Sequence, residues 1–394
     1  MANLRYALKA CMKKKRLLRI TTVPLSLVTL LKGQPRFFQE NNFEVLTISA
    51  AGKEVSQLIQ VGVEHKSVWL TRKITPFQDL IAVVQLIIII KKFKPHIVHT
   101  HTPKAGLLGM MASWICRVPV RLHTIAGLTW INDSGLKRWL LKKTEWLTYA
   151  LAHRVFPNSN NLRQFLLEEL RFDPVKTKVI GKGSSNGIDC ELFKPEGNLV
   201  NQALAIRKKN QVPDGEIIFS FVGRLVRDKG IIELVEAFIE LNKSLPCRLL
   251  LVGDFEPNLD PLPASTLQAL KNNPRIIMAG FQQDVRPWLL ASDVFVFPSH
   301  REGFPNGVLQ ACCLELPVIA TNINGCNEII QHGLSGLIVP VKSVESLRAA
   351  MMEIMNQPDL GISMGKEGRQ FVTTNFSQQF VWGELLKEYN GFWI

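Results

Sequence analysis

Residues 293–330 read DVFVFPSHREGFPNGVLQACCLELPVIATNINGCNEII, and their order of strand, loop and helix decides the fold. The apolar run 293–298 is typical of a strand buried in a parallel sheet. The loop 299–305 leaves the carboxyl end of that strand, and 306–314 is predicted to be the helix that follows. Ligands in open α/β sheets bind at this edge, so the stretch predicts both a parallel sheet and a ligand site.

The predicted helix start has the properties of an anion site. Backbone N–H groups of Phe304, Asn306 and Gly307 lie in or before the first turn, where they have no partner within the helix, and they suit a phosphate. Glu302 is then left to accept hydrogen bonds from the hydroxyls of an uncharged group. A sugar joined to a diphosphate is the simplest ligand with both parts. A helix start capped only for stability is the alternative.

The length and the charge of the chain limit its domain organisation and its possible partners. A chain of 394 residues exceeds what one core usually fills, so two domains of about 200 residues each are expected. Residues 1–195 hold 30 Lys and Arg against 12 Asp and Glu, whereas 196–394 hold 17 against 21. The first half therefore carries a net charge of +18, which suits nucleic acid, an anionic membrane surface or a phosphorylated acceptor.

Cysteine usage and the N-terminal segment indicate a cytoplasmic protein. The seven cysteines are scattered without a CxxC pair, so we expect reduced thiols and no zinc site. The apolar stretch behind the basic residues 13–19 is interrupted by Pro24, Lys32 and Pro35, which is not the pattern of a signal peptide. The longest apolar run, 80–90, is shorter than the roughly 18 residues needed to span a bilayer. We expect it to form a buried helix.

Strands and helices are predicted to alternate along the whole chain, which implies doubly wound parallel sheets. In the first half we expect strands at 17–23, 44–48, 97–100, 120–124, 154–157 and 177–180. Helices are expected at 27–40, interrupted near Gly33, and at 77–93, 104–116, 136–152 and 160–170. Residues 192–215 lack clear periodicity at their ends and carry Pro195, Gly197, Pro213 and Gly215, so they are the predicted linker. In the second half we expect further strands at 217–222, 248–252, 276–279, 318–321 and 336–339, and helices at 231–242, 263–271, 285–291, 344–355 and 378–389.

The motif FVGRLVRDKG at 221–230 adds two cations to the same sheet edge. Gly223 and Arg224 come just after a predicted strand, and Lys229 comes just before a predicted helix. Arginine offers a bidentate fork and lysine a mobile point charge, so together they can neutralise a departing diphosphate without a metal ion. The chain has no Asp-x-Asp pair, the usual carboxylates that bridge a metal ion to a nucleotide diphosphate. Solvated loop charges are the alternative.

Three histidines follow neighbouring strands of the first half. His123 lies at the end of the strand 120–124, and the sequence is equally compatible with a packing role and with contact to a ligand. His99 and His101 end the preceding strand, and we expect His99 to pack in the core. We place His101 on the acceptor side of a cleft together with Lys104, which would favour a pyrophosphate at a helix start.

Residues 136–150, LKRWLLKKTEWLTYA, combine basic residues with two tryptophans at helical spacing. Such a helix suits an anionic membrane surface. A solvated basic face with the tryptophans in the core is the alternative. The charge of the first half favours the membrane, so we expect a cytoplasmic protein bound peripherally to the inner face of the cytoplasmic membrane.

Two further loops are expected at the sheet edges where ligands bind. GSSNGID at 183–189 places Asn186 and Gly187 in a tight turn that needs a positive φ, and a plain turn without a ligand is equally open. Phe281 and Gln282 follow a predicted strand end, where we expect the base of a nucleotide to stack.

Several motifs together resemble the family 4 glycosyltransferases with the GT-B fold. In the second half these are GRLVRDKG (223–230), LLLVGDFEP (249–257), GFQQDVRPWLLASDVFVFPSHREGFPNGVLQA (280–311) and PVIATNINGCNEII (317–330). In the first half HTHTPKAGLLGMMAS (99–113), VPVRLHTIAGL (118–128) and GSSNGID extend the likeness to nearly the whole chain. The chain is similar to the bacterial branch that builds polyprenol-linked oligosaccharides, such as the N-acetylgalactosaminyltransferases acting on diphospho-undecaprenol acceptors.

The resemblance implies an α/β protein of two doubly wound, Rossmann-like domains that face a cleft. Residues 1–195 would bind the acceptor, 196–375 would bind the nucleotide sugar, and 376–394 would form a helix crossing back to the first domain. It also implies a retaining enzyme without cofactor or metal ion. That enzyme would move a sugar, such as an N-acetylhexosamine, from a UDP-linked donor to a polyprenyl-diphosphate-linked saccharide.

The resemblance also assigns residues to roles. Arg224 and Lys229 would hold the diphosphate, Glu302 would contact the donor sugar hydroxyls, and His123 would lie near the donor sugar and the acceptor. The donor would bind at Gly223, Phe281, Gln282, Phe304, Asn306, Gly307, Val308 and Gln310. The acceptor side would include His101, Lys104 and Asn186.

One position departs from the family pattern, which ends in a second Glu eight residues after the first. This chain has Gln310 there. An amide still pairs with two ribose hydroxyls, without charge-assisted strength, so we expect slightly weaker donor binding. A non-catalytic sugar-nucleotide-binding subunit is therefore the second candidate function. A basic nucleic-acid-binding protein is the third, but the chain lacks an aromatic and basic recognition module, so we expect no nucleic-acid partner.

Overall fold

The computed structural model describes residues 14–128, 130, 134–256 and 260–393. The chain divides into two compact units. Unit 1 comprises Met1–Asn186 and Val381–Ile394, and unit 2 comprises Gly187–Phe380. These boundaries differ from those expected at 195 and 375. The first falls at Gly187, whose positive φ of 66° turns the chain, and the second falls inside a continuous helix, which sequence periodicity cannot divide.

Unit 1 is built on a six-stranded sheet whose neighbouring strands are all parallel. The strand order β3-β2-β1-β4-β5-β6 changes direction between β1 and β4, and the loops after these two strands diverge at that point. The strands are β1 (Lys15–Ile20), β2 (Phe43–Ser49), β3 (Glu64–Ser67), β4 (Ile97–His101), β5 (Val120–Ile125) and β6 (Arg154–Pro157).

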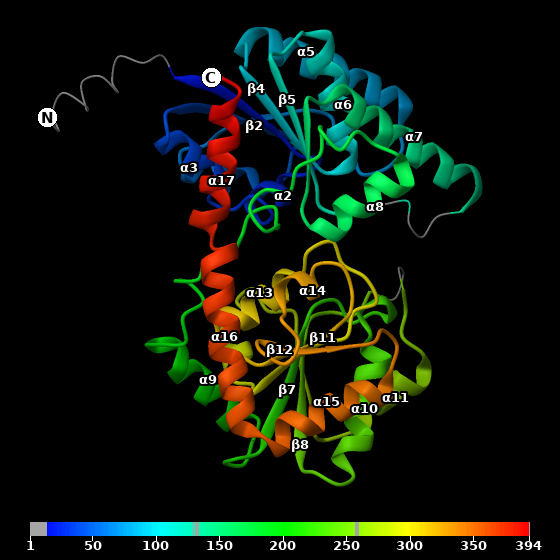
Figure 1. The fold of residues 1–394 in the computed structure, drawn as a ribbon, viewed down its shortest axis with the longest axis vertical. Coiled ribbons are helices and arrows are strands. Elements are labelled where there is room, and N and C mark those ends of the chain that lie inside the picture. The colour runs from blue at the N-terminus through cyan, green and yellow to red at the C-terminus, as the bar shows by residue number, and fades with distance from the viewer. Residues whose placement is uncertain (1–13, 129, 131–133, 257–259, 394) are drawn as a thin grey trace, which may run out of the picture. The chain divides into compact units, whose positions relative to one another are not determined.

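Helices cover both faces of this sheet (Figure 1). On one face α6 packs against α5 and against α7, and on the other Tyr389 of α17 stacks on Phe38 of α3 with ring centroids 4.8 Å apart. The helices are α2 (Pro24–Val28), α3 (Gln34–Glu40), α4 (Val55–Gln60), α5 (Pro76–Phe93), α6 (Pro103–Ile115), α7 (Gly135–Leu151), α8 (Asn160–Leu170) and α17 (Gln378–Gly391).

Unit 2 repeats the plan with a second parallel sheet in the order β12-β11-β10-β7-β8-β9. The order changes direction between β10 and β7, so the loops after these two strands lie at the point where ligands bind in such sheets. The strands are β7 (Ile217–Val222), β8 (Cys247–Val252), β9 (Ile276–Gly280), β10 (Val294–Phe297), β11 (Val318–Thr321) and β12 (Gly336–Val339).

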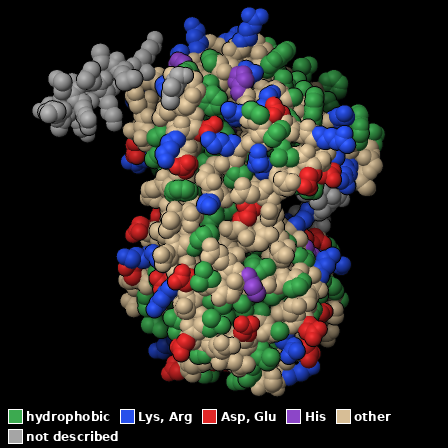
Figure 2. Space-filling view, in the orientation of Figure 1, with side chains coloured by type: hydrophobic (Ala, Val, Ile, Leu, Met, Phe, Trp, Pro, Cys, Tyr) green, Lys and Arg blue, Asp and Glu red, His purple; other side chains and the backbone are tan. Residues whose placement is uncertain are grey.

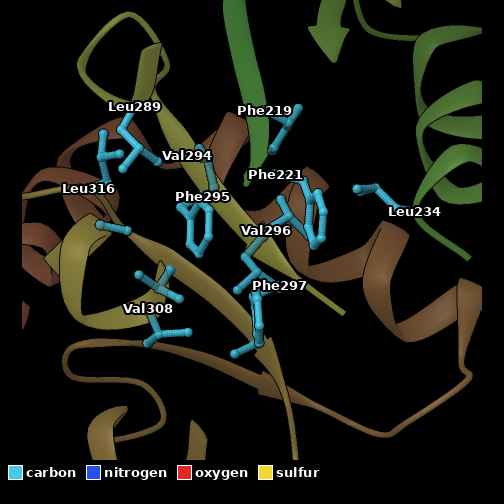
Figure 3. Packing of buried hydrophobic residues seen from close by; sticks show 14 of the residues in the cluster. Phe219, Phe221, Leu234, Leu289, Val294, Phe295, Val296, Phe297, Val308 and Leu316 are labelled. Atoms are coloured by element: carbon cyan, nitrogen blue, oxygen red, sulfur yellow. The ribbon is translucent and has the colours of Figure 1, made fainter. Parts of the chain in front are cut away.

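The core of unit 2 is centred on the two middle strands. Figure 3 shows Phe219 and Phe221 of β7 packed near Phe295 and Phe297 of β10, and all four side chains are buried. The surrounding helices are α9 (Asn198–Lys209), the 3₁₀ turn η1 (Arg227–Lys229), α10 (Ile231–Asn242), α11 (Ala264–Asn272), α12 (Arg286–Leu290), α13 (Asn306–Cys313), α14 (Cys326–Ile329), α15 (Val344–Asn356) and α16 (Pro358–Phe376).

The predicted fold class, with two doubly wound parallel sheets, is confirmed, but several local predictions were wrong. Residues 177–180 form no strand and contribute only an isolated bridge between Thr177 and Val155. The expected linker contains α9, in which only Ala203 is buried. The edge strand β3, with sequence EHKS, was missed because it has no apolar residue.

Helix α5 is buried on one side only, contrary to the prediction of a buried helix. Ala82, Val83 and Leu86 face the core, whereas Phe77 is 88% exposed and Ile88 61% exposed. A helix that is apolar on all sides cannot be oriented from periodicity, which explains the error. In the described part of the chain, no helix has both the length and the apolar character needed to cross a membrane.

Candidate active site

Two loops at the carboxyl edge of the unit 2 sheet approach each other closely. Gly230, which starts α10 with a φ of 71°, leaves no room for a side chain, because a Cβ there would lie 2.1 Å from the carbonyl oxygen of Pro298. The His300 N–H donates to the carbonyl oxygen of Asp228 at 2.8 Å, and the Ser299 hydroxyl donates to the same oxygen at 3.2 Å. Glycine at position 230 therefore keeps the loop after β7 against the loop after β10.

This contact brings Lys229 and Glu302 together. The Lys229 ammonium donates to Glu302 Oε1, and both side chains are largely shielded from solvent, with 14% and 19% exposed. A lysine at this point can give up the carboxylate for an incoming phosphate, and the carboxylate then accepts hydrogen bonds from hydroxyl groups. The structure therefore joins the two residues that were predicted to serve opposite parts of one ligand.

Arg224 lies on the same loop as Lys229 and is half exposed. Its Nη1 donates to Glu256 Oε2 at 2.8 Å, and this hydrogen bond raises the pKa of Arg224 above its ordinary value. The bond occupies one of the five guanidinium donors, so the others remain for a phosphate. Gly253 allows the β7 and β8 loops to meet here, because a Cβ at position 253 would lie 1.9 Å from the carbonyl oxygen of Gly223.

Helix α13 starts as the sequence predicted. Its N-cap is Pro305, which makes no side-chain capping bond. Among the described residues no acceptor pairs with the backbone N–H groups of Phe304, Asn306 and Gly307. The side chain of Val308 is buried in the core beneath this turn, so it supports the turn and does not face a ligand. Gln310 lies half-buried further along the helix.

Sequence reasoning missed the carboxylate of Asp228, which pairs with Arg301 across these loops. Asp228 Oδ2 lies 3.0 Å from Arg301 Nη2, and the Asp228 N–H donates to Asp260 Oδ2 at 2.7 Å. The bond between Asp228 and Arg301 crosses from the β7 loop to the β10 loop next to the Lys229 and Glu302 pair. In the sequence, Asp228 could have been noticed as an acidic residue between the basic residues Arg227 and Lys229.

The loop after β9 presents an aromatic ring at the same edge of the sheet. Phe281 is 71% exposed, and its backbone N–H donates to Asp254 Oδ1 at 3.1 Å. The Gln282 side chain is bent back to the carbonyl oxygen of Ala279 at 2.7 Å. The structure thus leaves the Phe281 ring open for stacking and uses Gln282 to shape the loop.

In unit 1, His123 lines a cavity of about 280 Å³ together with Thr102, Gly127 and Glu145. The imidazole Nδ1 lies 2.8 Å from the Thr100 hydroxyl. Burial lowers the pKa of His123 to about 3, so the ring is neutral near pH 7. At this position His123 can exchange hydrogen bonds with a ligand in the cavity, but it carries no charge.

His99 and His101 surround a buried arginine that sequence reasoning overlooked. Arg19 Nη1 lies 3.2 Å from His99 Nδ1 and 2.9 Å from His101 Nε2. Burial, together with the charge of Arg19, holds the pKa of His101 well below its ordinary value. His99 also contacts the Tyr389 hydroxyl at 2.5 Å and packs as expected. His101, in contrast, faces the interior of unit 1, so it is not placed to contact an acceptor.

Asn186 is held by three neighbours within unit 1. Its Oδ1 accepts from Gln34 Nε2 at 3.0 Å and from Trp382 Nε1 at 2.8 Å, and its Nδ2 donates to the carbonyl oxygen of Lys32 at 3.0 Å. The side chain therefore ties α17 to the rest of unit 1, and only the second N–H of Nδ2 is left for the predicted acceptor contact. The expected positive φ of this turn is present at Gly187.

Lys104 lies at the start of α6, as predicted, and lines a cavity of about 820 Å³. Its ammonium is already paired, 2.6 Å from Asp79 Oδ1, and it also donates to the hydroxyls of Thr71 and Thr75 at 3.1 and 3.0 Å. Lys104 thus joins the loop before α5 to the start of α6.

Comparison with known proteins agrees with this arrangement. Residues 203–371 match the family of glycosyl transferases group 1, and residues 30–192 match glycosyltransferase family 4. The capsular polysaccharide biosynthesis glycosyltransferase CapM of Staphylococcus aureus is 32% identical over 97% of this chain and 98% of its own. The UDP-Gal:alpha-D-GlcNAc-diphosphoundecaprenol alpha-1,3-galactosyltransferase of Escherichia coli is 30% identical over 78% of each chain.

The fold is also that of solved glycosyltransferases. The crystal structure of a glycosyltransferase from Rickettsia africae superposes with a TM-score of 0.80 at 22% identity, covering 97% of this chain and 99% of that one. The loops after β7 and β10, the start of α13 and the two parallel sheets agree with the resemblance stated from the sequence. The chain therefore belongs to the glycosyltransferases of family 4 with the GT-B fold, among enzymes of capsule and polysaccharide biosynthesis.

Proposed function

We propose that this glycosyltransferase moves a sugar from a nucleotide diphosphate donor to a polyprenyl-diphosphate-linked saccharide, with retention at the anomeric carbon and without a metal ion. The observation that carries the proposal is the Lys229 and Glu302 pair beside the unpaired N–H groups of α13. Cation and N–H groups suit the diphosphate, and the carboxylate suits the sugar. The names of relatives support a UDP donor and a diphosphoundecaprenol-linked acceptor.

In the proposed reaction the acceptor hydroxyl attacks the anomeric carbon on the face from which the diphosphate leaves. The bond from that carbon to the diphosphate oxygen breaks, the bond to the acceptor oxygen forms, and the hydroxyl proton passes to the departing phosphate. Arg224, Lys229 and the N–H groups of α13 stabilise the negative charge that grows on the leaving group. Glu302 holds the sugar hydroxyls, and Gln310 holds the ribose. The stacking of the base on Phe281 completes the donor site.

The acceptor in this proposal is a membrane lipid, so the enzyme would work on the inner face of the cytoplasmic membrane. Support comes from α7, where Trp139 is 56% and Trp146 48% exposed. This exposure contradicts the alternative in which both tryptophans pack in the core. Exposed tryptophans among lysines are typical of a helix that lies on an anionic membrane surface.

A transfer assay tests the proposed function. A thermal-shift screen of UDP- and GDP-sugars first identifies the donor, since a ligand that binds only the folded state raises the melting temperature. With that donor and a polyprenyl-diphosphate saccharide, we expect Lys229→Ala to lower turnover about 100-fold or more, as for other groups that stabilise transition-state charge. The matched control is Lys243→Ala, which removes an exposed ammonium paired with Glu240 outside these loops.

Two results would contradict the proposal. Unchanged turnover in Lys229→Ala would mean that the pair does not serve the diphosphate. Donor binding without transfer to any polyprenyl-diphosphate acceptor would support the alternative of a non-catalytic sugar-nucleotide-binding subunit.

A further inference from the structure

A cavity of unit 1 lies where two helices begin. It has a volume of about 820 Å³, within the range of small-molecule sites. Ile74 precedes α5, Pro103 starts α6, and both residues line the cavity. The positive ends of two helix dipoles are therefore close to it. One side of α7, from Lys137 to Glu145, also lines the cavity.

The charges around this cavity favour an anion. Arg72 and Lys73 are exposed at its rim, and no carboxylate pairs with either side chain among the described residues. Lys104 is balanced by Asp79, and the Glu145 carboxylate accepts hydrogen bonds from the Trp130 indole and the Tyr149 hydroxyl. Two unbalanced cations ahead of the start of α5, in a cavity that the start of α6 also lines, suit a group that carries two or more negative charges.

The remaining walls are apolar, and they continue onto the surface. Val23, Leu107 and Leu141 line the cavity, as do Ile74 and Leu140. Ile74 is 63% exposed and Leu140 42% exposed, so both belong to the cavity and to the outer surface at once. A ligand with an anionic head and an apolar tail could thus place its head inside and let its tail leave along these two side chains.

The surface that the cavity opens onto is unusually apolar. Helix α7 buries the polar residues Glu145 and Thr148 and exposes five large apolar side chains, the reverse of an ordinary surface helix. The exposed large apolar side chains of α5 and α7 together make up what we call the apolar face. They are Phe77, Leu80, Ile81, Val84 and Ile88 of α5 and Leu136, Trp139, Leu140, Trp146 and Leu147 of α7. Figure 2 shows hydrophobic and basic side chains mixed over this part of unit 1.

We infer that the 820 Å³ cavity binds the diphosphate and the first isoprenoid units of the lipid acceptor, and that the apolar face lies in the membrane beside it. This inference rests on the proposed function, because it names the place where the proposed acceptor enters. Arg72 and Lys73 contact the diphosphate, Ile74 and Leu140 contact the isoprenoid chain, and the lipid passes from the bilayer to the cavity without exposing its tail to water.

The saccharide end of the acceptor would point towards the neighbouring cavity that His123 lines. The large cavity and the 280 Å³ cavity share Thr102, Pro103 and Glu145 in their walls, and His123 lines the smaller one. A diphosphate at Arg72 and Lys73 therefore places the attached sugar next to the shared wall. This gives His123 a neutral, hydrogen-bonding role on the acceptor, consistent with its lowered pKa.

Binding of farnesyl diphosphate, measured by calorimetry with the full chain, tests the cavity. We expect farnesyl diphosphate to bind at least tenfold more tightly than inorganic diphosphate, and the double variant Arg72→Glu, Lys73→Glu to lose at least tenfold in farnesyl diphosphate affinity. The matched control is Lys91→Glu, Lys92→Glu, with the same charge change at the other end of α5, outside the cavity lining. The control should bind nearly as well as the unmodified protein.

Other results would overturn the cavity assignment. Equal losses in both double variants would show a general effect of charge, and equal affinity for inorganic diphosphate would remove the isoprenoid part. If lipid-linked acceptor is still glycosylated at the normal rate by the Arg72 and Lys73 variant, the proposed function stands and this site fails. If farnesyl diphosphate binds as expected but no donor sugar is transferred, the site stands and the proposed function fails.

Flotation with anionic vesicles containing phosphatidylglycerol tests the apolar face. Phe77→Gln, Leu80→Gln should float less than the unmodified protein and keep its affinity for farnesyl diphosphate, since neither residue lines the cavity. Leu204→Gln, at an exposed leucine of α9 in unit 2, is the control and should float normally. A protein that fails to float and instead self-associates through these residues would show that the face binds a second copy, which would overturn the membrane assignment.

Discussion

At position 310 this chain carries an amide where the family pattern carries a carboxylate. We expect Gln310→Glu to keep or raise donor affinity, by up to about tenfold, because a charged acceptor strengthens hydrogen bonds to the ribose hydroxyls by about 1 kcal/mol. Calorimetric titration of the donor measures the change. Gln370→Glu, at an exposed site on α16, is the control. Abolished binding would show that Gln310 does not hold the ribose.

His123 should make unit 1 sensitive to acid. Its folded-state pKa of about 3 lies below the ordinary value of 6.5, so between these pH values the unfolded chain binds a proton that the folded chain does not. The free energy of unfolding is therefore highest above pH 6.5 and falls as the pH drops towards 3. Each pKa unit corresponds to about 1.4 kcal/mol, which makes the loss between pH 6.5 and 5 about 2 kcal/mol.

Denaturant unfolding at pH 7 and at pH 5 checks this dependence. His123→Gln keeps a hydrogen-bonding group near Thr100 and cannot titrate, so it should lose less stability between the two pH values than the unmodified protein. His99 and His101 still titrate in the variant, because burial lowers the pKa of both, and some dependence should remain. An unchanged difference between pH 7 and pH 5 would contradict the assignment to His123.

Single residues were predictable where backbone geometry fixes their role. Lys229, Glu302 and the α13 N–H groups follow from a strand, a loop and a helix start in that order, and the structure brings them together. His101 and Arg19 were not predictable, because which side of β1 and β4 is covered by α17 depends on a segment far away in the sequence.

At the scale of elements, the contact between the β7 and β10 loops depends on Gly230. Gly230→Ala should destabilise unit 2 by about 1–3 kcal/mol, because its Cβ would meet the Pro298 carbonyl at a strained positive φ. It should also weaken donor binding, since it pushes Lys229 away from Glu302. Denaturant unfolding and the donor-induced thermal shift measure the two effects.

Gly215 provides the matched control for Gly230. It has a similar φ of 78°, but nothing lies within 4 Å of a Cβ at that position. Gly215→Ala therefore reports the backbone strain alone and should leave donor binding unchanged. Equal behaviour of the two variants would mean that the loop contact does not matter for the site.

Most elements with strong apolar runs were predicted to within about two residues of their bounds, and those of β7, β11, β12 and α10 were predicted without error. The strand β1, expected at 17–23, ends three residues earlier, at Ile20. The orientation of a helix was not predictable where both sides are apolar or amphipathic. The tryptophans of α7 are exposed while Glu145 and Tyr149 of the same helix form a buried hydrogen bond at 3.1 Å, an arrangement that no periodicity reveals.

On the scale of the whole molecule, charge is divided by unit. Unit 1 holds 30 Lys and Arg against 12 Asp and Glu, and unit 2 holds 17 against 21. Binding to anionic vesicles should therefore weaken as salt rises from about 0.05 to 0.5 M, because the Debye length shortens. Some binding should persist at high salt through the apolar face. Flotation with neutral vesicles is the control and should show little salt dependence; equal binding to both vesicle types would contradict a role for charge.

The fold class and the family could be predicted from the sequence because alternating apolar runs and loop motifs extend through both halves. The second boundary between the units could not, because α17 continues without interruption from Gln378 past Val381, and the boundary falls inside this helix.

The position of Tyr389 also has a consequence for how the protein is made. Phe38, Phe43 and Tyr389 share one buried cluster of unit 1, yet residues 381–391 emerge from the ribosome only after all of unit 2. The synthesis of unit 1 therefore begins first and ends last. Its incomplete core remains exposed to chaperones and proteases while unit 2 is being synthesised.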